Sequence, residues 1–182
     1  MKLRVKKVGL FFPDNAKLKA IFEEAFPAQE RFPYGLMVGL GCSPGGEFLA
    51  YYDGDELVGM TYNLVLGDMV FIFYLAVSSK WRGQGYGSAI LSQTVRLYPG
   101  KHICLDMEAL LPDAPNYEQR LRRSRFYLSN GFHDAKYRLF CRGQYFDLLY
   151  YGDEEAGERC IRFFERIPLL QGERLSEESG CD

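Results

Sequence analysis

Short apolar stretches separated by polar turn residues run along the first forty positions of the chain. Residues 3–12 favour a strand that Pro13 ends, because proline cannot donate a hydrogen bond to a sheet. Asp14 can cap a helix in which apolar residues recur every three or four positions, the spacing of one buried face. A second apolar stretch, residues 32–40, is short and is also expected to be helical.

Three strands are predicted next, in quick succession. Residues 47–52 lead into Asp53-Gly54, a dipeptide typical of hairpin turns, and residues 56–66 return. After a second turn, residues 69–77 (MVFIFYLAV) are apolar without alternation. A strand that is apolar on both faces is usually covered on both sides. The sequence therefore predicts an antiparallel meander whose last strand is central.

The pattern changes after position 77. Helical apolar spacing over residues 88–98 is followed by a buried strand at residues 102–107. This order of strand, helix and strand implies a right-handed crossover and a parallel pair. Residues 117–130 predict an arginine-rich helix that ends at Asn130-Gly131, a common signal for a helix C-terminus.

The last third of the chain completes the sheet. Residues 136–141 and 144–151 predict a hairpin whose second strand lies at an edge, where it could pair with a second copy in a homodimer. Residues 153–167 predict a closing helix. The fold class is therefore α/β (α+β), with a mixed, mostly antiparallel central sheet of about seven strands and helices on both faces. We expect one domain over residues 1–168 and a flexible C-terminal tail over residues 169–182.

Composition and charge narrow the possible partners. The 182 residues, 47% of them hydrophobic, suffice for one sizeable core. A net charge of −2 argues against nucleic acid as the partner, because that usually needs a strongly basic face. The five cysteines are odd in number and lack CxxC spacing, so we expect neither a disulfide framework nor a metal site.

The cysteines, expected to be reduced, predict a cytoplasmic protein, and hydropathy predicts no membrane partner. No apolar stretch approaches the roughly 20 residues that a membrane-spanning helix needs. The basic start of the chain is interpreted as a first strand and not as a signal peptide, because its apolar run is short and no cleavage site follows.

A glycine-rich segment lies between the central strand and the next helix. Its members are Arg82, Gly83, Gln84, Gly85, Tyr86, Gly87 and Ser88. Glycine lacks the Cβ atom that would keep a ligand away from the backbone, and a helix start offers unpaired N–H groups and the positive end of its dipole. Arg82 adds a positive charge at the mouth. The segment therefore predicts an anion site suited to a pyrophosphate.

Three interpretations of this segment stay open on its residues alone. Arg82, Gly85 and Gly87 fit the RxxGxG pattern, which would make the ligand CoA. Gly83 and Gly85 begin a dinucleotide fingerprint whose third glycine is missing, with Asp106 at a plausible distance for a ribose contact. The third interpretation is a turn without a ligand. A P-loop is excluded, because the tripeptide Gly-Lys-Ser/Thr is absent.

Two segments resemble those of the GNAT superfamily, the Gcn5-related N-acetyltransferases. The strand end at Leu75, Ala76 and Val77, with the glycine-rich segment after it, resembles the family's acetyl-CoA motif. Residues 126–132 (FYLSNGF) resemble the family's pattern of a tyrosine, three residues and Gly-Phe. The order of predicted elements is also similar over residues 3–151.

The resemblance implies a role for each segment. Backbone groups of Leu75, Ala76 and Val77 would hold the pantetheine arm and polarise the thioester carbonyl. The backbone of the glycine-rich segment would bind the pyrophosphate of acetyl-CoA. Tyr127 would lie near the CoA sulfur and protonate the departing thiolate. The implied function is transfer of an acetyl group from acetyl-CoA to a primary amine of a small molecule or a peptide.

Acyl transfer to an amine also needs a group that accepts the proton of the amine. Glu108 follows a buried strand and is the first candidate for this base, with Tyr74 and Glu47 as weaker ones. In the family, the early helical region overhangs the acceptor pocket. Phe32 and Tyr34, together with Phe26, lie in this region and either line the pocket or pack on the sheet.

The arginines of the predicted helix 117–130 depart from the family pattern. Arg120 and Arg123 replace the Asn and Ala of many relatives, which suggests that a different, anionic group is held there. Helical spacing allows Arg120 to share a face with Arg123, and Arg122 with Arg125. Two rival functions stay open at this point: an enzyme that uses NAD or S-adenosylmethionine, and a non-catalytic acyl-CoA-binding module.

Overall fold

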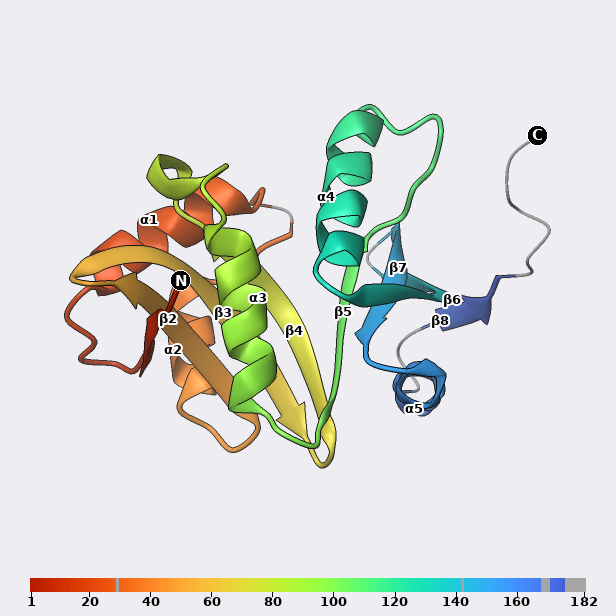
Figure 1. Cartoon of the computed structure of the whole chain (residues 1–182), viewed down its shortest axis with the longest axis horizontal. Helices are drawn as coiled ribbons and strands as arrows, with labels where there is room; N and C mark the ends of the chain where they lie inside the picture. Colours follow the sequence, from red (N-terminus) through yellow and green to blue (C-terminus); the bar gives the residue numbers. More distant parts are fainter. Residues whose placement is uncertain (29, 142, 168–170, 176–182) are drawn as a thin grey trace. The chain divides into compact units, whose positions relative to one another are not determined.

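The computed structural model describes residues 1–28, 30–141, 143–167 and 171–175 (Figure 1). The chain folds into two compact units. The first is Met1–Lys101 and the second begins at His102.

Four antiparallel strands form the sheet of the first unit. They are β1 (Arg4–Lys7), β2 (Gly46–Asp53), β3 (Glu56–Leu66) and β4 (Met69–Val77), and each pairs with the next. The predicted hairpin turn and the strand of nine apolar residues are both confirmed. Because consecutive strands are joined by tight turns, the meander needs no crossover within this unit.

Helices cover both faces of this sheet (Figure 1). α1 (Asn15–Ala25) and α2 (Tyr34–Gly41) pack on one face, whereas the short 3-10 helix η1 (Ser79–Trp81) leads into α3 (Tyr86–Leu97) on the other. The core under α1 and α2 includes Leu18, Phe22, Met37, Phe48, Ala50 and Met60. The core under α3 includes Leu49, Tyr51, Val58, Tyr86 and Ile90. Neighbouring residues of β2 thus point into different cores, as the alternation of a strand requires.

Asp14 precedes α1 as expected, but its side chain makes no capping hydrogen bond. Its carboxylate lies 2.9 Å from Lys17 Nζ and accepts a hydrogen bond of 2.8 Å from the hydroxyl of Tyr52. The side chain therefore joins the start of α1 to β2, and the expected cap is wrong.

The second unit also has an antiparallel sheet of four strands. They are β5 (His102–Glu108), β6 (Phe132–Cys141), β7 (Gln144–Tyr151) and β8 (Gln171–Arg174). β7 pairs with β5 on one side and with β6 on the other, and β6 also pairs with β8. The expectation that residues 144–151 form an edge strand is therefore wrong, because β7 lies between two partners. The homodimer expected from that edge stays a prediction.

Two helices cover opposite faces of the second sheet. Tyr150 of β7 lies against Gly157 of α5 (Glu154–Glu165), where an added Cβ would come within 2.8 Å of its ring. Tyr151, whose side chain points the other way, packs on Phe132, which contacts Tyr127 of α4 (Tyr117–Ser129). The helices expected at residues 117–130 and 153–167 are confirmed with slightly shorter bounds.

The flexible tail expected over residues 169–182 is not found at residues 171–174, which form β8. Arg174 pairs with Glu158 at 2.8 Å and with Glu165 at 3.3 Å, both on α5. Because the four residues of β8 are all exposed, no apolar alternation marked this strand in the sequence. The other residues expected in the tail lie outside the described residues, apart from Leu175, whose N–H donates to the carbonyl of Lys136.

The expected fold class is confirmed. The described residues form eight strands in a mostly antiparallel arrangement, with helices on both faces, and the eighth strand is β8. Within the part of the chain that the structure describes, no helix is long and apolar enough to cross a membrane.

Candidate active site

The glycine-rich segment joins β4 to α3 through η1. Gly83 and Gly85 have φ angles of +71° and +83°, a region that other residues enter only with strain. A Cβ atom built on either glycine would meet no atom of the protein within 4 Å. The glycines therefore serve the shape of the turn and leave open space beside its backbone.

Side chains at both ends hold this turn in place. The hydroxyl of Tyr86, in the first turn of α3, donates to Asp53 at 2.8 Å, and its ring packs edge-to-face on Trp81 at 5.3 Å. Gln84 Nε2 donates to the carbonyl of Lys80 at 3.0 Å. Local contacts thus fix the backbone of the turn before any ligand arrives.

The start of α3 offers free backbone donors. The first helical hydrogen bond runs from the N–H of Ala89 to the carbonyl of Gly85 at 3.1 Å. The N–H groups of Tyr86, Gly87 and Ser88 precede it and have no helical acceptor, because the helix has no turn before them. Together with the open space at the glycines, these donors and the helix dipole fit a pyrophosphate.

Arg82 is turned toward the protein and not toward the open side of the loop. Its Nε donates to the carbonyl of Val77 at 3.1 Å, and its guanidinium lies 3.2 Å from the carboxylate of Glu24 on α1. The other oxygen of Glu24 accepts a hydrogen bond of 3.0 Å from Ser79. The arginine that was expected to add charge at the mouth therefore forms an ion pair with an acidic side chain of the protein.

β4 changes its register just before the three residues expected to hold the pantetheine arm. Tyr62 pairs with Tyr74, whereas Asn63 pairs with Ile72, so Phe73 is an extra residue in a bulge of β4. Bulges of this kind re-aim a strand and are common beside active sites. Leu75, Ala76 and Val77 follow the bulge and stay paired with β3.

Close packing of α3 supports this end of β4. A Cβ built at Gly59 would lie 2.4 Å from the carbonyl oxygen of Ala76 and 2.6 Å from Cδ1 of Ile90. Only glycine fits there, so the sequence allows β3, β4 and α3 to meet at the residues that carry the expected site.

Tyr127 lies in the second unit, near the end of α4. Its ring packs on Phe126 at 5.2 Å and edge-to-face on Phe132 at 6.1 Å. Burial raises the pKa of Tyr127 to about 12, the charge of Arg123 opposes this shift, and the charge of Asp106 adds to it. The phenol is therefore protonated at neutral pH, which is the form that a general acid needs.

Glu108 ends β5 and is only 8% exposed. Its carboxylate pairs with Arg120 at 3.2 Å and with Arg123 at 2.5 Å, and Asn116 Nδ2 donates to it at 3.0 Å. Arg120 also donates to the carbonyl of Ala109 at 2.8 Å. The anionic group that the two arginines were expected to hold is thus, in this structure, a side chain of the protein.

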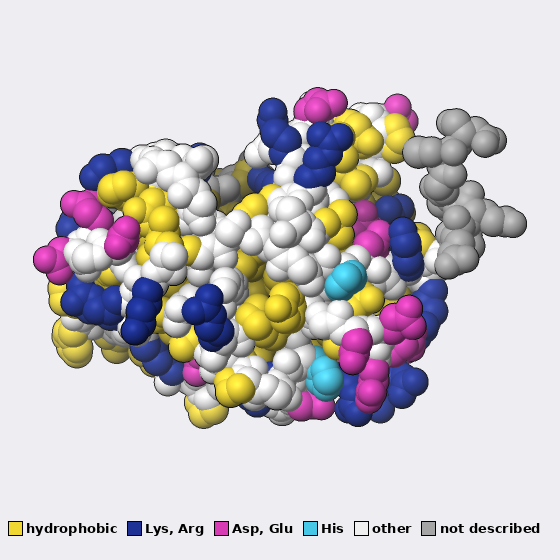
Figure 2. Space-filling view, viewed as in Figure 1, with side chains coloured by type: hydrophobic (Ala, Val, Ile, Leu, Met, Phe, Trp, Pro, Cys, Tyr) yellow, Lys and Arg dark blue, Asp and Glu magenta, His cyan; other side chains and the backbone are white. Residues whose placement is uncertain are grey.

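The arginines of α4 divide as the helical spacing predicted. Arg120 and Arg123 share Glu108, whereas Arg122 and Arg125 are exposed. Figure 2 shows Lys and Arg side chains gathered over the α4 region of the surface. Arg120 and Arg123 thus belong to a partly buried network, whereas Arg122 and Arg125 lie at the surface, so the two pairs have different environments.

Asp106 is a titratable group that the sequence suggested for a ribose contact and not for proton transfer. It lies in β5 opposite Leu148 of β7, and burial raises its pKa to about 7. A charged residue inside the apolar stretch HICLDM was the signal available in the sequence. Groups with a pKa near neutrality are suited to proton transfer.

A family model for the acetyltransferase (GNAT) domain matches residues 44–134. This range is half of the chain and includes the glycine-rich segment, Glu108 and Tyr127.

The chain belongs to the GNAT acetyltransferase family.

Solved GNAT structures share its fold at low sequence identity. An acetyltransferase assigned to this family from Bacteroides thetaiotaomicron is 19% identical, with a TM-score of 0.71 over 91% of this chain and 98% of that one. The ribosomal-protein-S18-alanine N-acetyltransferase of Escherichia coli is 15% identical, with a TM-score of 0.61 over 82% and 92%. A Bacillus subtilis acetyltransferase solved in complex with CoA is 18% identical, with a TM-score of 0.56 over 84% and 99%. A search of curated proteins by sequence returned no match.

GNAT membership confirms the expected reaction in its general form. The chain is an enzyme that transfers an acyl group from acetyl-CoA to an amine. Among the residues that the structure describes, no group of three or more His, Cys, Asp and Glu side chains could hold a metal ion.

Proposed function

We propose that this GNAT enzyme transfers an acetyl group to a primary amine by direct attack of the amine, with Tyr127 as general acid. The observation that carries the proposal is the place of Tyr127, a half-buried phenol near the end of α4 in the segment FYLSNGF that resembles the family's tyrosine motif. Its pKa of about 12 leaves it protonated at neutral pH. A protonated hydroxyl can give its proton directly to the departing thiolate, so the tyrosine needs no earlier proton transfer. Direct attack needs no covalent intermediate on the protein.

Two segments of the first unit would hold acetyl-CoA, which supplies the acetyl group as a thioester when bound. The backbone of the glycine-rich segment from Arg82 to Ser88 would bind the pyrophosphate through free N–H groups. The backbone of Leu75, Ala76 and Val77 would bind the pantetheine arm and place a fixed N–H donor at the thioester oxygen. Open space at Gly83 and Gly85 supports the first assignment.

Two carboxylates of β5 are candidates for the base. Glu108 is the one expected from the sequence, but its oxygens already accept hydrogen bonds from two arginines and Asn116. Each of these contacts occupies an acceptor site of the carboxylate that the proton of the amine would otherwise use. Asp106, with a pKa of about 7, accepts a proton more readily near neutral pH. We propose the two as alternatives, because Glu108 lies at the position expected from the sequence and Asp106 has a pKa of about 7.

Two variants separate these candidates. If Asp106 is the base, Asp106→Asn removes the rise of kcat/KM near pH 7, while Glu108→Gln keeps the shape of the pH profile. If Glu108 is the base, Glu108→Gln changes the shape of the profile, while Asp106→Asn keeps it. The profile shape discriminates better than the rate alone, because either variant can also lower the amount of folded enzyme.

The experiment that tests the general acid is Tyr127→Phe. We expect kcat to fall by about 10²- to 10⁴-fold, because the hydroxyl is lost while the ring keeps its contacts with Phe126 and Phe132. The Kd for CoA, measured by calorimetry, should stay within twofold. Tyr117→Phe, at the other end of α4, is the matched control and should leave kcat unchanged.

Steady-state kinetics test the direct attack. Release of the CoA thiol is followed while acetyl-CoA and a primary amine are varied together, and intersecting double-reciprocal lines are expected. Parallel lines would indicate a covalent acetyl-enzyme and contradict the proposal. Full activity of Tyr127→Phe would likewise contradict the role of the phenol. The cytoplasmic location expected from the sequence stays a prediction.

A further inference from the structure

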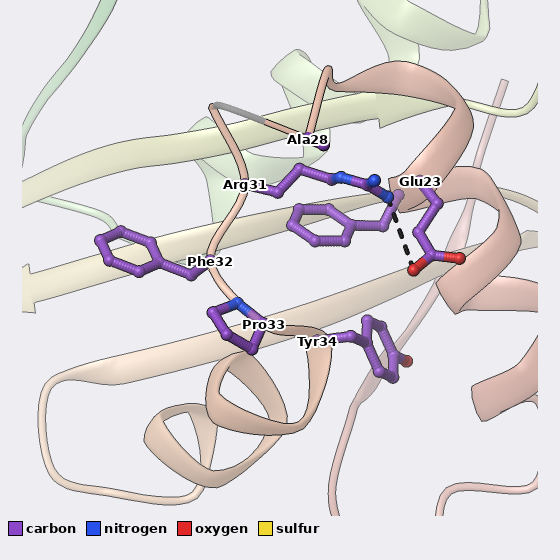
Figure 3. A pocket seen from close by; sticks show the side chains of 7 residues that line it. Glu23, Ala28, Arg31, Phe32, Pro33 and Tyr34 are labelled. Carbon is purple, nitrogen blue, oxygen red and sulfur yellow. Dashed lines mark ion pairs between the residues drawn. The ribbon is translucent and has the colours of Figure 1, made fainter. Parts of the chain in front are cut away.

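A cavity in the first unit lies between α1 and α2 (Figure 3). Its volume is about 250 Å³, and its lining residues are Phe22, Glu23, Ala28, Arg31, Phe32, Pro33 and Tyr34. Pockets for drug-sized ligands usually measure about 300–1,000 Å³. A compound the size of one amino acid fits this volume better.

The wall of this cavity is fixed to the strand that would hold the acetyl donor. The hydroxyl of Tyr74 in β4 donates to the carbonyl of Glu30 at 2.7 Å. The N–H of Phe32 donates to the same hydroxyl at 3.3 Å. Tyr74 directly precedes Leu75, so the segment between α1 and α2 is attached to β4 beside the proposed pantetheine contacts.

Aromatic rings make up much of the lining. Phe22 lies 6.1 Å from Tyr34, and Phe32 lies 5.8 Å from Phe73 of β4, measured between ring centroids. The hydroxyl of Tyr34 donates to Asn15 Oδ1 at 2.9 Å and is therefore already bonded. The rings offer a ligand apolar faces and edges, which suit another flat apolar group.

Arg31 and Glu23 are the charged residues of this lining. The side chain of Arg31 is only 22% exposed, yet its one ion pair among the described residues is a long contact of 3.5 Å with Glu23 (Figure 3). A guanidinium has five N–H donors in a planar fork that matches a carboxylate. Most of the donors of Arg31 are therefore available to a ligand in the cavity.

The local charge balance also favours an anion. Glu23 Oε1 lies 3.5 Å from Arg31 and 3.9 Å from Lys19, so two cations share one carboxylate. The neighbouring Glu24 is engaged with Arg82. Arg31 thus shares the carboxylate of Glu23 with Lys19 and does not hold it alone.

We propose that the cavity selects the acceptor, and that this acceptor is an amine carrying a carboxylate and an aromatic ring, as an aromatic amino acid does. Arg31 binds the carboxylate through its planar fork, and the rings of Phe22 and Tyr34, 6.1 Å apart, lie beside the aromatic ring of the acceptor. The inference rests on the proposed function for the reaction itself, but the binding of the carboxylate does not require that reaction.

The first test uses 3-phenylpropanoate, which has the ring and the carboxylate but no amine to acetylate. Calorimetry on the full chain should show binding, and 3-phenylpropan-1-ol should bind at least about 10-fold more weakly, because a hydrogen bond between charged groups is lost. Equal binding of the acid and the alcohol would overturn the proposal, and so would absence of binding by the acid.

Variants of the two cations that share Glu23 make the test specific. Arg31→Gln should weaken the binding of 3-phenylpropanoate about 10- to 100-fold. Arg31→Lys should weaken it less than Arg31→Gln but leave the affinity below that of the wild type, since an ammonium keeps the charge and lacks the planar fork. Lys19→Gln also removes a positive charge beside Glu23, but Lys19 does not line the cavity. The Kd of this variant for 3-phenylpropanoate should stay within twofold of the wild-type value. Similar losses for Lys19→Gln and Arg31→Gln would refute a direct contact.

Turnover then separates this proposal from the proposed function. Phenylalanine should be acetylated with a kcat/KM about 10-fold or more above that of phenylalaninamide or phenethylamine, and Arg31→Gln should remove this preference. If 3-phenylpropanoate binds through Arg31 but no amine is acetylated, the pocket assignment stands and the proposed function fails. If amines are acetylated without a preference for the carboxylate, the function stands and the pocket assignment fails.

Discussion

The carboxylate of Glu24 lies 3.2 Å from the guanidinium of Arg82 and thus joins α1 to the loop proposed for the CoA pyrophosphate. The same carboxylate accepts a hydrogen bond from Ser79 at 3.0 Å. An acidic group beside a phosphate site weakens the site, because it repels the ligand and neutralises a cation.

Glu24→Gln should therefore tighten CoA binding. Both side chains of the pair are about half exposed, with 51% for Arg82 and 44% for Glu24. The effect should be modest, up to about fivefold in Kd, the equivalent of about 1 kcal/mol. Calorimetry at low and high salt checks this, since the gain should shrink as salt screens the charges. Glu23→Gln is the adjacent control, and a similar gain there would contradict the role of the Arg82 pair.

Gly85→Ala should abolish CoA binding while the protein stays folded. The φ angle of +83° makes any side chain cost about 1–2 kcal/mol of stability, but no protein atom lies within 4 Å of the new Cβ. The methyl group would instead occupy the space proposed for the pyrophosphate.

Gly54→Ala is the matched control for this variant. Gly54 has a φ angle of +56° and equally open surroundings, but it lies in the turn between β2 and β3. Thermal unfolding should show similar losses for both variants, whereas only Gly85→Ala should lose affinity for CoA. Unchanged affinity in folded Gly85→Ala would remove the glycine-rich segment from the proposed site.

Glu108→Gln should destabilise the protein, whichever carboxylate is the base. The variant leaves the charges of Arg120 and Arg123 without a carboxylate in a partly buried network. We expect a loss of about 3 kcal/mol in the free energy of unfolding, the low end for a broken buried pair, because Arg123 is 37% exposed. Urea unfolding measures this loss. The control is Glu118→Gln, which changes an exposed acidic residue of α4, the helix that carries the two arginines. A loss under about 1 kcal/mol would show that the network contributes little.

Asp106 should make stability depend on pH in a defined window. Its pKa rises from 3.8 to about 7 on folding, so between these values the folded chain holds a proton that the unfolded chain has lost. The free energy of unfolding should therefore fall as the pH rises from about 4 to 7 and then level off. Asp106→Asn should lack this decline, as seen by urea unfolding at several pH values. Asp113→Asn, in an exposed loop, should keep the wild-type dependence of stability on pH. If both variants lost the decline, a group other than Asp106 would be responsible for it.

Local patterns were enough to predict most elements and on which of them the expected site residues lie. The apolar run at residues 69–77 determined β4, because its side chains need cover on both faces. The glycines of the segment after it were correctly placed in a turn, since a positive φ is a property of the residue itself. The position of Tyr127 near the end of a helix followed from the Asn130-Gly131 signal.

Pairings between distant residues were decided only by the tertiary structure. β8 is polar and exposed, so the strand is stabilised by pairing with β6 and by ion pairs with α5, and not by a pattern of its own. The place of β7 between β5 and β6 likewise depends on which edge is free when the hairpin docks, which no local pattern records.

The chemistry of the site divides in the same way. The sequence by itself determined that the chain contains a glycine-rich turn, a helix start after it and a tyrosine near the end of a later helix. Each of these features depends on residue type and near neighbours. Only the folded chain decided that Arg82 faces Glu24 and that Glu108 is held by Arg120 and Arg123. Such ion pairs and the pKa of a buried group arise from burial and from charges brought together across elements, and these exist only after folding.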